Sequence, residues 1–356
     1  MTRVKEILIL GATYGALLAT KLQLSGHNCT MVCLPDEASL INAEGLRTRI
    51  PVRGRENLVE IDTRKARGTV RALGPADARP EDYDLIALAM QEPQYRLPGV
   101  RELLARVAAS GRATMSIMNM PPLPYLARIP GVDPDALRHC YADPSVWDGF
   151  DPQAMTLASP DPQAFRPPDA PANVLQVSLP TNFKCAAFVR EHDTAILRTL
   201  EADIMATRFD AGDATVELPV KLKVHDSVHV PLAKWAMLMT GNYRCITPDG
   251  PRAIRDAVHS DIEASRAIYE WVCGVCVSLG APASDMVPFE KYANAAQGLA
   301  KPSSAARALY GGAPFIERVD RLVQGIAAGL GRANSVLDET VALVDAQLDK
   351  NRAAAA

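Results

Sequence analysis

The sequence predicts an α/β protein in which a doubly wound parallel sheet is followed by an all-helical domain. A strand, helix, strand pattern opens the chain over residues 4–34, and apolar runs at 84–90 and 114–118 flank another predicted helix. Strand signals then fade in the C-terminal part of the chain. Because 356 residues are many for one hydrophobic core, two domains are expected, at 1–212 and 213–356.

The opening pattern is typical of a Rossmann-like βαβ unit. Val4–Leu10 is an apolar run expected to form a buried strand, and Cys29–Leu34 is expected to form the next one. The helix between them begins after a glycine-bearing turn, so its first backbone N–H groups are free to bind a pyrophosphate. The residues predicted to form this cofactor-binding turn are Gly11, Ala12, Thr13, Tyr14 and Gly15.

The turn has the spacing G-x-x-x-G, one residue shorter than the common fingerprint G-x-G-x-x-G. An alternative is a secretory signal, because Arg3 and Lys5 precede an uncharged segment. Glu6, the two glycines and a second strand at βαβ distance favour the dinucleotide-binding unit.

The middle of the first domain repeats the doubly wound pattern. Its expected elements are helices at 37–45 and 100–110, a short strand at 46–50, edge or hairpin strands at 58–62 and 69–73, and central strands at 84–90 and 114–118. Gln91, Gln94 and Asn119 follow the carboxyl ends of strands, where such sheets bind ligands.

A proline-rich insertion is expected at residues 121–180, which hold 13 of the chain's 27 prolines. Prolines at this density exclude long helices and central strands, so short strands are expected only at 156–158 and 174–179. Trp147 and Phe150 are lid or interface candidates, with ordinary packing as the alternative. A helix at 195–202 follows, and the run at 205–209 is expected to be the last strand of the sheet.

The remainder of the chain shows helical spacing. Helices are expected at 216–245, 252–280, 305–309, 315–330 and 336–348. Cys273 and Cys276 are expected to pack in the core, because no second cysteine pair accompanies them at zinc-site distance. His225 and His229 are four residues apart and fit one side of a helix.

Composition excludes several classes of partner. A formal charge of -3 without a basic run argues against nucleic acid and anionic membrane surfaces, and no apolar stretch is long enough to span a bilayer. Seven scattered cysteines fit reduced thiols, so a cytoplasmic protein is expected.

Lys234, Leu238 and Asn242 are spaced to share one helix face. A lysine there can donate a proton, and its ammonium can stabilise an alkoxide formed when a carbonyl accepts hydride. The asparagine can hold the same oxygen. A solvated surface lysine is the structural alternative.

Four segments carry a resemblance to a known family. GATYGALLATKLQLSGHNCTMVCL, followed by LINAEGLRTRI, resembles the N-terminal half of the ketopantoate reductase (2-dehydropantoate 2-reductase) family. PLAKWAMLMTGNYRCIT is similar to its helix with a catalytic lysine, KPSSAARALYGGAPFIERVD to its Ser-Ser segment, and GLGRANSVLDETVALVDAQL to its C-terminal end. The resemblance covers most of the chain outside the insertion. It implies a divergent member whose second domain resembles the C-terminal fold of 6-phosphogluconate dehydrogenase.

The resemblance implies an NADPH-dependent reductase of 2-oxo acids with pantothenate biosynthesis as its setting. Lys234 matches the general acid and Asn242 a substrate-positioning asparagine. Ser303 or Ser304 matches the partner of a substrate hydroxyl, although serines after Pro302 are also suited to cap a helix.

On the cofactor side, Asn119 matches the asparagine lining the nicotinamide pocket and Glu317 a cofactor-side partner, with a helix-dipole role as the alternative for Glu317. Gln91 stands where the family usually has a lysine near the cofactor.

The choice between NADP and NAD stays open. Leu34 occupies the position after the second strand where an arginine often meets the 2′-phosphate of NADP. Asp36 and Glu37 could instead accept the 2′-hydroxyl of NAD.

Three functions remain. The first is a reductase acting on the carbonyl of a 2-oxo acid. The second is an opine-type dehydrogenase reducing an imine, which Leu238 in place of the family's asparagine would suit. The third is a non-catalytic dinucleotide-binding regulatory protein. A homodimer is an expectation for the helical half.

Overall fold

The structure, a computed structural model, describes residues 3–12 and 14–355, so Thr13 of the predicted turn lies outside the described residues. The chain divides into two compact units. The first holds the chain up to Met90 together with Gln94–Tyr125 and Ser145–Asp226. The second holds Gln91–Pro93, Leu126–Pro144 and everything from Ser227 onward.

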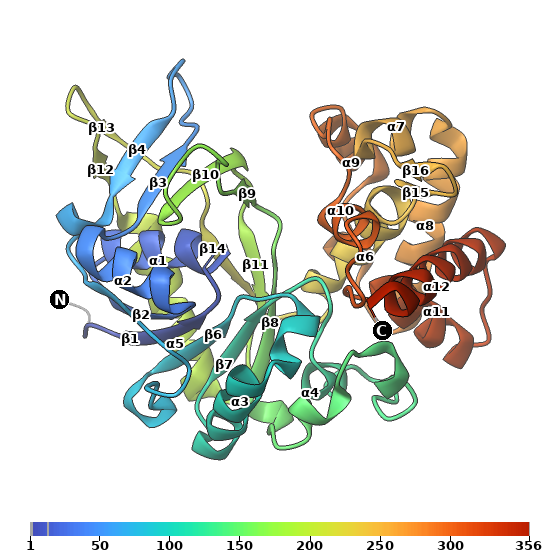
Figure 1. The fold of residues 1–356 in the computed structure, drawn as a ribbon, viewed down its shortest axis with the longest axis horizontal. Helices are drawn as coiled ribbons and strands as arrows, with labels where there is room; N and C mark the ends of the chain where they lie inside the picture. The colour runs from blue at the N-terminus through green and yellow to red at the C-terminus, as the bar shows by residue number, and fades with distance from the viewer. Residues whose placement is uncertain (1–2, 13, 356) are drawn as a thin grey trace. The chain divides into compact units, whose positions relative to one another are not determined.

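An eight-stranded sheet forms the centre of the first unit (Figure 1). Its order is β14-β11-β8-β7-β6-β1-β2-β5. The strands are β1 (Glu6–Leu10), β2 (Asn28–Val32), β5 (Val70–Leu73), β6 (Leu85–Leu88), β7 (Thr114–Ile117), β8 (Met155–Ser159), β11 (Phe183–Ala186) and β14 (Leu222–His225). All neighbours pair in parallel except β8 with β11. The chain runs outward from β1 to β5 and then restarts beside β1 at β6, which confirms the predicted doubly wound sheet.

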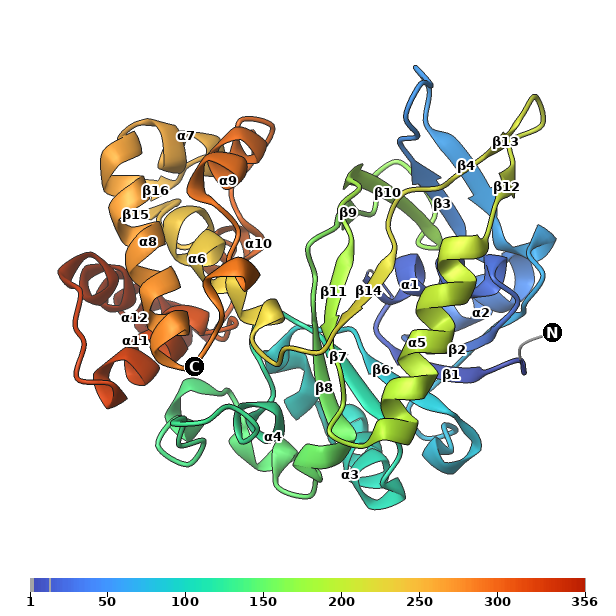
Figure 2. The ribbon, with the colours of Figure 1, turned by 180° about the vertical axis from the view of Figure 1, so that it is seen from behind.

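Helices cover both faces of this sheet. The crossover from β1 to β2 carries α1 (Tyr14–Leu24), which shares a buried apolar core with α5 (Glu191–Ala206). Figure 2 shows α5 lying across the sheet on that face. The crossover from β6 to β7 runs in the opposite direction, so its helix α3 (Pro98–Ser110) covers the other face.

A smaller sheet is attached to the first unit. It has the order β4-β3-β10-β9 and contains β3 (Arg47–Ile50), β4 (Val59–Asp62), β9 (Gln163–Phe165) and β10 (Val174–Leu179). β3 and β4 pair antiparallel, whereas β3 and β10 are parallel. The helix α2 (Pro35–Glu44) follows β2 and packs against β5. The strands expected at 156–158 and 174–179 are confirmed, as β8 in the large sheet and β10 in the small one. The expectation that the insertion holds no central strand is wrong, because β8 pairs with β7 on one side and β11 on the other.

Two expectations for the end of this unit are wrong. The run at 205–209 does not join the large sheet, because β12 (Phe209–Asp210) pairs with β13 (Thr215–Val216) in a separate hairpin. The helix expected from residue 216 is replaced by β14, which pairs with β11. Leu218, Val220, Leu222 and Val224 are all buried, a spacing of two typical of a strand. The first unit therefore continues past residue 212, to Asp226.

The second unit is mainly helical, as expected (Figure 1). Its helices are α6 (Lys234–Met237), α7 (Ile254–His259), α8 (Ile262–Ser278), α9 (Phe289–Ala296), α10 (Ser304–Tyr310), α11 (Val319–Gly329) and α12 (Ser335–Ala355), with a hairpin of β15 (Ile246–Thr247) and β16 (Gly250–Pro251). Part of the proline-rich insertion, Leu126–Pro144, belongs to this unit. The short helix α4 (Leu123–Leu126) lies where the chain passes between the units.

The structure shows where several side chains singled out in the sequence lie. Trp147 is buried and packs edge-on against Tyr95, with ring centroids 5.5 Å apart, so the packing alternative holds for it. Cys276 is buried in α8, and burial raises its pKa to about 12. The expectation that His225 and His229 share a helix is wrong, because His225 ends β14 and His229 precedes a 3-10 turn.

Within residues 3–12 and 14–355, none of the helices combines the length and the apolar character that a membrane span requires.

Candidate functional site

The glycine turn lies at the carboxyl end of β1, at the point where the strand order reverses. Gly11 has φ +101°, and a Cβ there would lie 2.5 Å from Met90 Cγ and 2.6 Å from the Ala89 carbonyl oxygen. Only glycine fits this conformation and this close approach of the β1 and β6 ends. The Gly11 N–H donates to the Val32 carbonyl at 3.1 Å, which ties the turn to β2 as well.

The start of α1 fits an anionic ligand. Ala12 and Tyr14 are partly buried, Tyr14 is the first residue of the helix, and Gly15 is buried in its first turn. No acidic residue occupies that first turn, so nothing in it repels a phosphate. The 11-residue helix presents the positive end of its dipole at this edge of the sheet.

Asn119 and Gln91 follow neighbouring strands of the same sheet. β1, β6 and β7 are parallel, so their carboxyl ends lie at one edge. Asn119 is partly buried just beyond β7, whereas Gln91 is exposed and begins the short Gln91–Pro93 stretch that groups with the second unit.

In the second unit, Lys234 is the partly buried first residue of α6. The helix then changes to a π-turn over Leu238–Asn242, closed by the Tyr243 N–H donating to the Leu238 carbonyl at 2.9 Å. The sequence spacing of Lys234 and Asn242 assumed a continuous α-helix. The π-turn shifts the residues after it, so that assumption is wrong, and such turns are frequent at functional sites.

Asn242, Ser303 and Glu317 are brought together around the end of this π-turn. The Ser303 hydroxyl donates to the Asn242 carbonyl at 2.6 Å and accepts from the Ala306 N–H at 3.0 Å, so it caps α10. Ser304 is exposed at the start of that helix. The Tyr243 hydroxyl donates to the Glu317 carbonyl and accepts from the Val319 N–H at 3.1 Å.

Glu92 is a buried acid that the sequence analysis missed. It is 2% exposed, its N–H donates to Glu317 Oε1 at 3.4 Å, and its Oε1 accepts from the Ala142 N–H at 3.0 Å. Burial raises the pKa of Glu92 to about 8, and the charge of Glu317 acts in the same direction. No pattern in the sequence signals this, because Glu92 begins a short 3-10 helix and is buried by segments distant in the chain.

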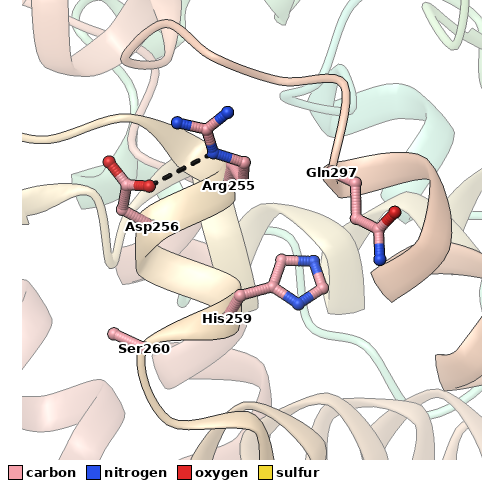
Figure 3. Close-up of a pocket in the computed structure, with 5 residues that line it drawn as sticks. All are labelled: Arg255, Asp256, His259, Ser260 and Gln297. Atoms are coloured by element: carbon pink, nitrogen blue, oxygen red, sulfur yellow. Dashed lines mark hydrogen bonds and ion pairs between the residues drawn. The ribbon is translucent and has the colours of Figure 1, made fainter.

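Two adjoining surface hollows lie elsewhere on the second unit. One, of about 340 Å³, is lined by Arg255, Asp256, His259, Ser260 and Gln297 (Figure 3). The other, of about 410 Å³, shares His259 and Gln297 with it. Arg255 is paired with Asp256 at 3.3 Å, and neither hollow contains a residue predicted from the sequence.

Metal ligation finds no support in the described part of the chain, where no group of three or more His, Cys, Asp or Glu side chains could hold an ion.

No protein-family model matches the chain, and no curated protein matches it significantly in sequence. Solved structures resemble it over nearly its whole length. One is 2-dehydropantoate 2-reductase from Methylococcus capsulatus, with a TM-score of 0.64, 15% identity and 97% of both chains covered. Another is D-mandelate dehydrogenase with NADH and anilino(oxo)acetate, with a TM-score of 0.63, 14% identity and coverage of 98% of this chain and 99% of that one. A dimeric ketopantoate reductase from Staphylococcus aureus has a TM-score of 0.61, 11% identity and coverage of 97% and 99%. The chain therefore has, over nearly its full length, the fold of the solved ketopantoate reductases, as the sequence resemblance implied.

Proposed function

We propose that this chain is an NAD(P)H-dependent reductase of 2-oxo acids, similar to ketopantoate reductase, with Lys234 as its proton donor. The observation that carries the proposal is the glycine turn at the point where the strand order of the sheet reverses. The chain around it has the fold of ketopantoate reductases over nearly its full length. The oxoacetate and NADH in the mandelate dehydrogenase structure support the same substrate and cofactor classes.

The cofactor would supply the hydride that reduces the carbonyl carbon. The Gly11–Gly15 turn and the start of α1 would hold its pyrophosphate, with Asn119 beside the nicotinamide. The Lys234 ammonium would donate a proton to the carbonyl oxygen, so that the ketone becomes a secondary alcohol. Its charge would also stabilise the developing alkoxide.

Asn242 and Ser304 are the proposed substrate contacts. Asn242 is partly buried at the end of the π-turn, and Ser304 is exposed as the first residue of α10. Ser303 is the weaker candidate, because its hydroxyl already caps the helix and binds the Asn242 carbonyl. Glu317 stays a proposed cofactor-side residue, positioned by the Glu92 N–H.

Lys234→Ala tests the proposal. Loss of a general acid should lower kcat by about 10²- to 10⁴-fold, while the Kd for nicotinamide nucleotide stays within about threefold. Lys291→Ala, at an exposed lysine of α9 in the same unit, is the matched control and should leave both values unchanged. Normal turnover by Lys234→Ala would refute the mechanism.

An imine-reducing dehydrogenase is the second candidate. Residue 238, where the family has an asparagine, is a leucine that is 2% exposed. This position therefore offers no amide to a substrate. Assays of 2-oxo acids with and without added amines separate the two: oxidation of NAD(P)H that requires the amine favours imine reduction. Nucleotide binding without turnover on either panel would favour a regulatory protein.

A homodimer is also proposed, since one structure with this fold is described as dimeric. Light scattering coupled to size-exclusion chromatography should give twice the mass of the 38.3 kDa chain. A monomer mass at micromolar concentration would contradict it.

A further inference from the structure

Position 34, just after β2, holds a leucine where a residue that contacts the ribose of a bound dinucleotide is often found. In such folds an acid there binds the ribose 2′-hydroxyl of NAD, or an arginine binds the 2′-phosphate of NADP. Leu34 follows β2 with 70% of its surface exposed, and its apolar side chain can do neither. Other residues near this position must therefore determine which cofactor fits, and these include Asp36 and Glu37 in the first turn of α2.

Two acids stand nearby: Asp36 is exposed, whereas both carboxylate oxygens of Glu37 are engaged. Oε1 pairs with Nη1 of Arg166, and Oε2 accepts from the Leu34 N–H at 3.4 Å. The Glu37 side chain is 14% exposed, whereas that of Arg166 is 33% exposed. Of the two paired side chains, the guanidinium is therefore the more accessible to a ligand, and it offsets the charge of the carboxylate.

Arg166 reaches this place from the proline-rich insertion. It follows β9 of the small sheet directly, yet its side chain contacts α2 in the segment after β2. The Cys33 thiol lies beside the same pair: burial and the Glu37 charge raise its pKa to about 11, and Arg166 opposes that rise. These three residues therefore gather at the carboxyl end of β2.

We propose that Arg166 binds the ribose 2′-phosphate and makes the chain selective for NADPH over NADH; this rests on the proposed dinucleotide-dependent function. A guanidinium has five N–H donors in a planar fork, so an arginine that pairs with Glu37 through Nη1 keeps further donors that suit phosphate oxygens. Glu37 is a positioning residue, which holds the guanidinium in place. The insertion thus supplies the cation that Leu34 does not.

Binding of nucleotides to the intact protein tests this inference without any turnover. NADPH and NADH titrations are compared with 2′,5′-ADP and 5′-AMP, which differ in the 2′-phosphate and carry no nicotinamide. Arg166→Ala should raise the Kd of NADPH and 2′,5′-ADP by about 10- to 100-fold, the loss expected for charge-assisted hydrogen bonds. The Kd of NADH and 5′-AMP should change by less than about threefold.

Two further variants control for structure. Arg49→Ala removes another arginine of an ion pair, with Glu60, two strands away in the same small sheet, and should leave all four Kd values unchanged. Arg166→Lys keeps the charge without the fork and should give an intermediate loss for NADPH. The thermal unfolding midpoint of Arg166→Lys should equal that of the parent protein. This variant therefore keeps the comparison valid if Arg166→Ala folds poorly.

The outcomes are distinguishable. Equal losses for NADPH and NADH in both Arg166 variants, or a parent protein that prefers NADH, would overturn the role of Arg166 while leaving the reductase proposal standing. A parent protein that binds none of the four nucleotides would overturn both.

Discussion

Burial of Glu92 changes what this carboxyl does at neutral pH. Its pKa of about 8, against an ordinary 4.5, means that the folded protein holds a proton there that the unfolded chain releases. The free energy of unfolding should therefore fall as pH rises from about 5 to 8, by up to about 1.4 kcal/mol per pH unit, and then level off.

Glu92→Gln should flatten this dependence, because the amide keeps an acceptor for the Ala142 N–H and carries no titrating proton. Urea unfolding at pH 5.5, 7 and 8.5 measures it. Glu60→Gln, at a side chain 45% exposed, should keep the parent's slope. The interpretation is wrong if Glu92→Gln also keeps the parent's dependence of stability on pH.

Ser303 and Ser304 are adjacent in sequence but differ in their partners. Ser303→Ala removes the cap of α10 and the donor to the Asn242 carbonyl, so it should lower stability by about 1–3 kcal/mol. Ser304→Ala should leave thermal unfolding unchanged and raise KM for the 2-oxo acid. If Ser303→Ala changes KM alone, its hydroxyl contacts substrate after all.

At the scale of elements, the β1 turn depends on Gly11. Gly11→Ala should lower stability by about 2 kcal/mol or more, because φ is positive and the new Cβ meets Met90 and Ala89. It should also weaken nucleotide binding, since the turn must move. Gly54→Ala is the matched control: its φ is +81° with nothing within 4 Å, so it isolates the backbone cost. Denaturant unfolding measures both variants. An equal loss in the free energy of unfolding for the two would show that the close contact at Gly11 does not matter.

At the scale of the whole molecule, the helical unit is not continuous in sequence. Leu126–Pro144 belongs to it, and Leu137 Cδ2 would lie 2.9 Å from a Cβ placed on Gly325 of α11. A fragment beginning at Ser227 should therefore lack part of its own core. We expect it to unfold without a cooperative transition by circular dichroism and to bind a hydrophobic dye. Cooperative unfolding at the intact chain's midpoint would contradict this.

The sequence by itself determined the fold class and the order of most elements. The apolar runs that became β1, β6 and β7, and the glycine turn after β1, are local patterns whose meaning depends on few other residues. The resemblance also indicated the fold, which the chain shares with solved ketopantoate reductases. The roles of Lys234, Asn242 and Glu317 remain predictions.

Only the tertiary structure decided the features that depend on distant partners. β14 joins the sheet because β11 lies beside it. Glu92 becomes a weaker acid than an ordinary glutamate because segments near Ala142 and Glu317 enclose it. Arg166 reaches Glu37 through a strand of the insertion. In each case a local pattern cannot report the outcome, because burial and charge pairing arise from contacts between residues far apart along the chain.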